Sequence, residues 1–141
     1  MPPIKETWDK WFENNVDIVN RTIYIGPINN NDGNESGTDA FMAEAAIKAM
    51  HVLESKNTEP IIILTNNPGG DWYHGMAIYD VIKQAKSHCT IKTFGYVMSI
   101  GSIILQAADK RVMMPHSKFM IHFGSIAIDH HIKSAERIME E

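Results

Sequence analysis

The chain has 141 residues, of which 44% are hydrophobic and 21% charged, and its formal net charge is −4. This length and composition fit one domain over residues 1–141 with a real core, and they exclude a disordered tail, a collagen-like fibre and a cysteine-rich mini-protein. The single cysteine, Cys89, excludes an intrachain disulfide. We find no basic stripe for nucleic acid, no apolar run long enough for a bilayer and no signal peptide. We therefore expect a cytoplasmic, soluble protein that binds neither nucleic acid nor membrane.

The first predicted elements are a helix, a strand and a second helix. Apolar side chains near the N-terminus recur with helical spacing at Ile4, Trp8, Trp11 and Phe12. They predict an amphipathic helix within residues 1–20 whose stripe packs on the core or on another subunit. Thr22–Gly26 predicts a strand, and the polar, turn-rich residues 29–37 predict a mobile surface loop. Either Thr38 or Asp39 then caps a helix. The expected inward side chains of that helix are Phe41, Ala45, Ala46, Met50 and Leu53.

The middle of the chain predicts two further strands with helices after them. The branched run Ile61–Leu64 is typical of a central strand buried on both faces, and it ends in the loop at 66–70. A helix follows, with Met76, Ala77 or Ile78, Val81, Ile82 and Ala85 expected to point inward. Thr90–Phe94 predicts a strand that stops at Gly95, and Ile103–Ala108 predicts a buried helix.

The last predicted elements are two short strands, at 112–114 and 119–121, around the turn at 115–117, and then a helix from Ile128 to Glu141. Strands that alternate with helices predict an α/β fold with a mainly parallel sheet. Ligands of such sheets collect at the carboxyl ends of the strands.

Three small features lie at such strand ends. Ser99, between glycines where a strand gives way to a helix, is placed to act as a nucleophile, or it simply caps the helix. His122, after an apolar strand, can act as a general base, or it bonds a backbone carbonyl. The glycines Gly69 and Gly70 allow a backbone N–H to approach a ligand and form part of an oxyanion hole, or they form a type II turn.

We expect neither a metal nor another cofactor. Within 129–131 two histidines are adjacent, and neighbouring side chains on a helix point about 100° apart rather than sharing a face.

Four blocks in one consistent order resemble the proteolytic subunit of the Clp protease. Residues 63–70 and 75–80 resemble the N-S-P-G-G…G-M-x-I-Y-D block of that family, and residues 95–102 are similar to its G-x-A-x-S-M-G-A nucleophile motif. Residues 115–122 resemble its P-N-S-R-x-M-I-H block, and residues 21–26 fit its first strand.

The resemblance implies a crotonase-like fold of β-β-α units and a serine-type endopeptidase. Ser99 would be the nucleophile and His122 the base, and the N–H groups of Gly70 and Ile100 would hold the oxyanion. The remaining predicted contacts to an extended polypeptide substrate are Gly69, Asp71, Trp72, Phe123, Gly124 and Ser125. The resemblance also implies rings, with seven subunits each. The sequence does not decide whether an AAA+ unfoldase is a partner, because the N-terminal helix does not resemble the hairpin that contacts that ATPase in the family.

The aspartate that completes the triad in the family follows its long handle helix, whose start we place at residues 126–141. The third triad residue is therefore expected beyond Glu141, with Asp71 and Asp80 as substitutes within the chain. The alternative functions are a catalytically weak structural subunit of the same fold and an acyl-CoA enzyme on the crotonase scaffold. A serine–lysine pair through Lys118 is disfavoured, because that lysine lacks the reach to Ser99.

Overall fold

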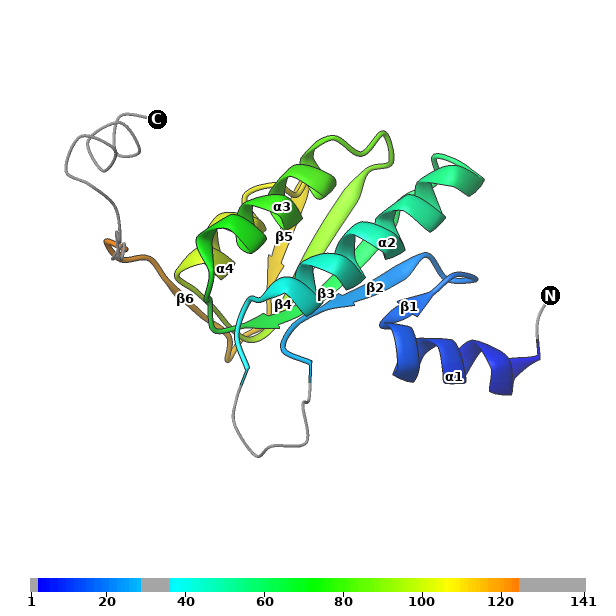
Figure 1. The fold of residues 1–141 in the computed structure, drawn as a ribbon, viewed down its shortest axis with the longest axis horizontal. Helices are drawn as coiled ribbons and strands as arrows, with labels where there is room; N and C mark the ends of the chain where they lie inside the picture. The colour runs from blue at the N-terminus through cyan, green and yellow to red at the C-terminus, as the bar shows by residue number, and fades with distance from the viewer. Residues whose placement is uncertain (1–2, 29–35, 125–141) are drawn as a thin grey trace.

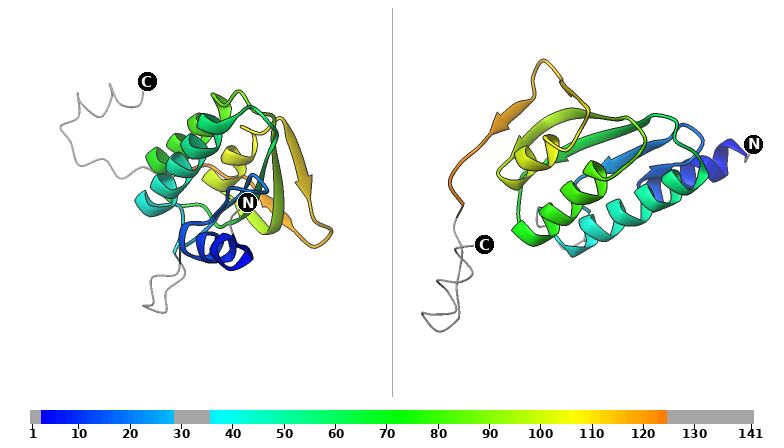
Figure 2. Two further views of the ribbon diagram at one scale, coloured as in Figure 1. Left: turned by 90° about the vertical axis from the view of Figure 1, so that its right-hand side faces the viewer. Right: turned by 90° about the horizontal axis from the view of Figure 1, so that it is seen from above.

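The computed structural model describes residues 3–28 and 36–124, in which one layer of helices packs on a mainly parallel sheet. The strands are β1 (Val16–Asp17), β2 (Thr22–Ile25), β3 (Ile61–Asn67), β4 (Cys89–Met98), β5 (Lys110–Met113) and β6 (Lys118–Met120). The helices are α1 (Ile4–Asn14), α2 (Ala40–Lys56), α3 (Trp72–Lys83) and α4 (Ile100–Leu105). Helices α2, α3 and α4 lie on one face of the sheet (Figure 1, Figure 2). The predicted α/β class is confirmed.

The sheet runs in the order β1-β2-β3-β4-β5, and β6 pairs with β4. Every pair is parallel except β1–β2. The register aligns Ile23, Ile63 and Ile91 across three neighbouring strands, and each of these side chains is buried. The short strand β1 is absent from the sequence prediction, since two residues give no periodic signal.

Strand β3 is buried on one face only, so the prediction of burial on both faces is wrong. Its side chains alternate, with Ile61 and Ile63 fully buried and Ile62 and Leu64 partly exposed. The reason is visible in Figure 2, where the helices cover a single face of the sheet. A continuous apolar run does not by itself say how many layers cover a strand.

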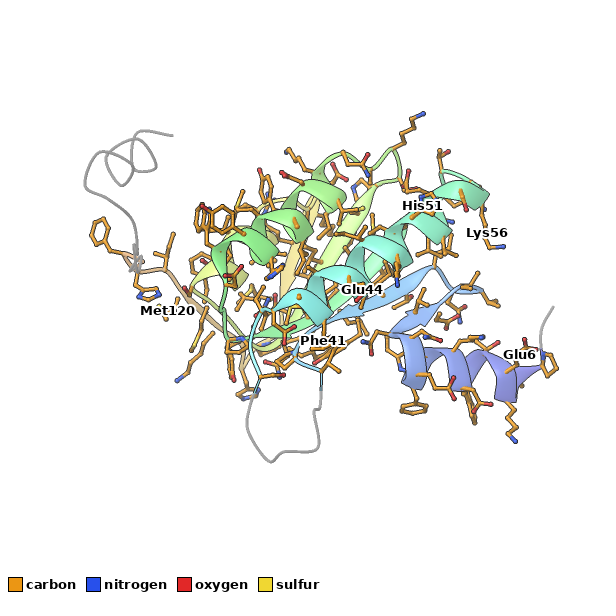
Figure 3. The ribbon with its side chains drawn as sticks, viewed as in Figure 1. Glu6, Phe41, Glu44, His51, Lys56 and Met120 are labelled. Atoms are coloured by element: carbon orange, nitrogen blue, oxygen red, sulfur yellow. The ribbon has the colours of Figure 1, made fainter. Side chains whose placement is uncertain are left out.

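Helix α2 begins as predicted but faces the sheet with a different set of side chains. Asp39 is its N-cap and accepts a hydrogen bond of 2.9 Å from the backbone N–H of Met42. Phe41, predicted to point inward, is 61% exposed and lies on the outer side of the first turn (Figure 3). The buried side chains are Met42, Ala43, Ala46, Ala49, Met50 and Leu53. The buried face of α2 therefore begins at Met42, one residue later than the predicted Phe41.

The predicted N-terminal helix is present as α1, but its stripe does not pack on the core of the described residues. Ile4, Trp8 and Phe12 are 69%, 62% and 80% exposed, and only Trp11 is half-buried. Helix α1 contacts β1 at the edge of the sheet (Figure 1). The predicted helix at 128–141 lies outside the described residues, as does most of the predicted loop at 29–37.

Contrary to the prediction, strand β4 does not stop at Gly95, and its extra residues lead directly to Ser99. Gly95 has a φ of +75°, which bends the chain, but the strand continues beyond it to Met98. The first half of β4 pairs with β5, and residues 96–98 pair with β6. Helix α4 starts at Ile100 rather than at the predicted Ile103. The serine between β4 and α4 therefore stands directly at a strand end.

Candidate active site

The parallel pairing of β4 with β6 brings Ser99 and His122 together. Met98 is in register with Met120, and the N–H of Ser99 donates to the carbonyl of Met120 over 2.9 Å. Ser99 then lies one residue beyond its strand, and His122 lies two residues beyond Met120, which Figure 3 labels. The Nε2 of His122 is 2.9 Å from the Oγ of Ser99, a hydrogen-bond distance. This is the geometry of a nucleophile and its base.

Ser99 is not a helix cap in the ordinary sense. It occupies the N-cap position of α4, but its side chain makes no capping hydrogen bond and its backbone has φ +54° and ψ −125°. A non-glycine residue in this region costs about 1–3 kcal/mol and persists only where its surroundings enforce it. The hydroxyl is directed to His122 instead. The structure thus favours the nucleophile interpretation over the cap.

The loop after β3 lies directly against Ser99. Gly69 has φ +94°, and a Cβ added there would stand 2.7 Å from the Cβ of Ser99 and 2.8 Å from the carbonyl oxygen of Met98. No side chain fits in that gap, so only glycine allows the loop to approach the serine.

The predicted oxyanion donors are the backbone N–H groups of Gly70, which follows Gly69 in the loop, and of Ile100, which follows Ser99. Thr38 forms a parallel bridge with Gly70, in which the N–H of Thr38 donates to Gly69 (2.7 Å) and the N–H of Asp71 donates to Thr38 (2.9 Å). In a parallel bridge the central residue directs its own N–H to the opposite edge. Within the described residues neither Gly70 nor Ile100 donates a backbone hydrogen bond. That both N–H groups hold an oxyanion stays a prediction.

The other predicted substrate contacts surround the same loop and strand end. Trp72, the first residue of α3, is 54% exposed, and Phe123 is fully exposed beyond His122. Gly124 is also exposed, and Ser125 lies outside the described residues. Because Thr38 occupies one edge of the Gly70 segment, an extended peptide would have to pair along the other edge.

Neither substitute acid forms an ion pair with His122 in the described residues. The carboxylate of Asp71 caps α3 by accepting from the N–H of His74 over 2.8 Å. Asp80 lies on α3 beside a groove shared with Ile47 of α2. Within residues 3–28 and 36–124 no carboxylate forms an ion pair with His122, and no hydrogen bond joins Lys118 to Ser99.

The described residues form neither a cluster of metal ligands nor a membrane-spanning helix. No three histidine, cysteine, aspartate or glutamate side chains among them gather closely enough to hold a metal ion. No helix in that part of the chain has the length and apolar character needed to cross a membrane.

Sequence reasoning assigned no role in the site to Asn67 and Thr38. Both form hydrogen bonds that fix the loop after β3. The Oδ1 of Asn67 accepts from the Oγ1 of Thr38 and from the N–H of Gly69, each over 2.9 Å. Asn67 is 1% exposed. Its Asn-Pro-Gly-Gly context predicts a turn, but it continues the inward alternation of Ile61, Ile63 and Thr65, and that register was the available signal.

Comparisons with known proteins show the family of the chain. The sequence profile of the Clp protease family matches residues 33–141. The chain belongs to the Clp protease family. It is 40% identical over 111 residues to the ATP-dependent Clp protease proteolytic subunit of Deinococcus radiodurans, a match that covers 77% of this chain and 50% of that protein. It is 38% identical over 123 residues to proteolytic subunit 2 of Prochlorococcus marinus subsp. pastoris, covering 82% of this chain and 55% of that protein.

The fold agrees as well. ClpP1 from Listeria monocytogenes superposes with a TM-score of 0.68 at 29% identity, covering 87% of this chain and 68% of that one. The predicted family and crotonase-like fold are therefore confirmed. The chain spans about half the length of the curated relatives it matches. Within the family block N-S-P-G-G, this Clp protease family member carries Asn67 in place of the serine.

Proposed function

We propose that this chain acts as a serine-type endopeptidase subunit that cleaves polypeptides by acyl transfer. The observation that carries the proposal is the 2.9 Å contact between the Oγ of Ser99 and the Nε2 of His122, made by a serine whose backbone is strained and whose hydroxyl caps no helix. Membership of the Clp protease family supports the same reaction.

The reaction follows from the positions of four groups. The Oγ of Ser99 attacks the scissile carbonyl while His122 takes the serine proton. The N–H groups of Gly70 and Ile100 stabilise the negative charge that develops on the carbonyl oxygen. His122 then returns the proton to the leaving amine, and water, activated by the same histidine, releases the acyl group from Ser99. A carboxylate that orients His122 stays a prediction beyond Glu141.

The proposal extends to assembly and setting. The resemblance to the family supports polypeptide substrates, self-association into rings with seven members each and a cytoplasmic location. The name of the relatives, ATP-dependent Clp protease proteolytic subunit, supports an ATPase partner. Such rings would enclose the Ser99 sites and limit them to chains that have been unfolded.

The test is covalent labelling of the serine. A fluorophosphonate probe should modify the full-length protein, and Ser99→Ala should abolish both labelling and peptide hydrolysis. Ser117→Ala is the matched control, because Ser117 lies in the turn before β6 and bonds Met114. Absence of labelling in a folded, assembled protein would overturn the proposal in favour of a structural subunit. Turnover of an acyl-CoA that survives Ser99→Ala would favour the crotonase-type enzyme.

A further inference from the structure

Asn67 lies where the two halves of the oxyanion hole meet. On one side its amide oxygen accepts from the N–H of Gly69, which precedes Gly70 in the loop. On the other side it borders the start of α4, because a Cβ added at Gly101 would stand 2.9 Å from the backbone oxygen of Asn67. Asn67 is also in register with Val97, two residues before Ser99.

The orientation of the amide is set by its partners. The backbone N–H of Gly69 can only donate, so the atom of Asn67 that faces it must be the oxygen. The amide nitrogen then faces the sulfur of Met42 at 3.6 Å. The same oxygen accepts from the hydroxyl of Thr38, whose backbone is paired with Gly69 and Asp71. One buried atom therefore ties the loop to both β3 and Thr38.

We propose that Asn67 is a positioning residue for the reaction, and that with Thr38 it forms a clasp that keeps the N–H of Gly70 directed at the oxyanion. The inference rests on the proposed function. A buried donor left without its acceptor is costly, so removal of the amide makes the loop seek other partners. Since Gly69 lies against Ser99, any such shift moves Gly70 relative to the serine. Donors of an oxyanion hole act only when their positions are fixed in advance.

Two variants and one control separate positioning from stability. Asn67→Leu removes the acceptor and keeps the branched outline of the side chain, whereas Asn67→Ser, the residue of the family block, keeps an uncharged oxygen acceptor. Thr65→Val is the matched control, because Thr65 is a buried β3 residue two positions earlier whose hydroxyl bonds Ile25 over 2.6 Å, away from the loop. If Asn67→Leu fails to fold, Thr38→Val replaces it, since it removes one donor of the clasp.

Two measurements on the full-length protein decide the matter. The maximal rate of fluorophosphonate labelling should fall about 10- to 100-fold in Asn67→Leu with little change in KI, and less in Asn67→Ser and Thr65→Val. Hydrogen exchange of peptides that contain Gly69 and Thr38 should quicken in Asn67→Leu and not in Thr65→Val.

Each outcome has one meaning. Labelling of Asn67→Leu at the rate of Thr65→Val, or unchanged exchange at Gly69 and Thr38, would overturn the inference. If the wild-type protein is not labelled at all, the proposed function fails. The exchange data then decide the clasp without it: faster exchange in Asn67→Leu alone would support it.

Discussion

Ser99 and Arg21 stand at opposite ends of the parallel strands, and both have a positive φ, of +54° and +48°. Arg21 precedes β2 at the amino ends, and its guanidinium donates hydrogen bonds to four acceptors within the protein. Those acceptors are the backbone oxygens of Leu53, Asn57 and Glu59 and the hydroxyl of Ser87. Ser99 follows β4 at the carboxyl ends, and among the described residues its hydroxyl bonds His122, which is itself exposed.

The same backbone strain therefore serves two purposes. At Arg21 it directs a cation to acceptors at the amino end of the sheet, whereas at Ser99 it directs a hydroxyl to the exposed His122. The two residues differ in their partners, because Arg21 is buried among several acceptors whereas Ser99 has a single exposed histidine as its partner among the described residues.

Ser99→Gly should have the largest effect on the difference between the two residues. Labelling and hydrolysis should fall by about 10⁴-fold or more because the nucleophile is gone. The free energy of unfolding should rise by about 1 kcal/mol, because glycine adopts this backbone without strain. Urea unfolding measures the gain, and Ser117→Gly, at an ordinary φ, should lose stability instead. A loss of stability in Ser99→Gly would mean that the serine carries no strain.

The next largest effect is expected at the other end, with Arg21→Met. Several buried acceptors lose their donor, so the free energy of unfolding should fall by about 2–4 kcal/mol. Labelling of Ser99 in the folded fraction should stay near the wild-type rate. Arg111→Met is the control, because Arg111 is exposed and, within the part of the chain that the structure describes, donates a single hydrogen bond, to Ala108. Equal losses in the two variants would show that the Arg21 contacts contribute little.

Much of the fold could be predicted because its signals are local. Apolar runs, turn residues and helical spacing gave the order of strands and helices, and they placed Ser99 and His122 at strand ends. Sequence could not give the side of each helix that packs, as Phe41 shows, since that depends on what lies opposite. Nor could it say that the apolar run of β3 has one open face.

The candidate site was predictable in its members but not in its geometry. The contact of Ser99 with His122 depends on the register of β4 with β6, which exists only because β4 continues past Gly95. A glycine predicts a break, and the pairing beyond it is a long-range event with no local signal. The role of Asn67 could not be predicted, because the turn-forming residues that follow it indicate a loop rather than a buried strand position.

The smallest predicted effect compares the two ends of β4 itself. Cys89 begins the strand, is 1% exposed and donates to the carbonyl of Ser87 over 3.5 Å. Burial raises the pKa of its thiol to about 11 from an ordinary 9.0, with help from the carboxylates of Asp109 and Glu54 and opposition from Arg21. Unlike Ser99 at the other end, Cys89 should be unreactive: iodoacetamide should modify it only after unfolding.

The raised pKa also predicts how stability depends on pH. Between about pH 9 and 11 the unfolded chain releases the thiol proton while the folded chain keeps it, so the unfolded state binds fewer protons and stability falls as pH rises. The loss of stability should reach about 2 kcal/mol near pH 11. Urea unfolding of the wild type and Cys89→Ala across this range isolates it, because tyrosines and lysines titrate in both proteins. Parallel stability curves would show that the thiol ionises alike in both states, and Cys89 would then be no more sheltered than Ser99.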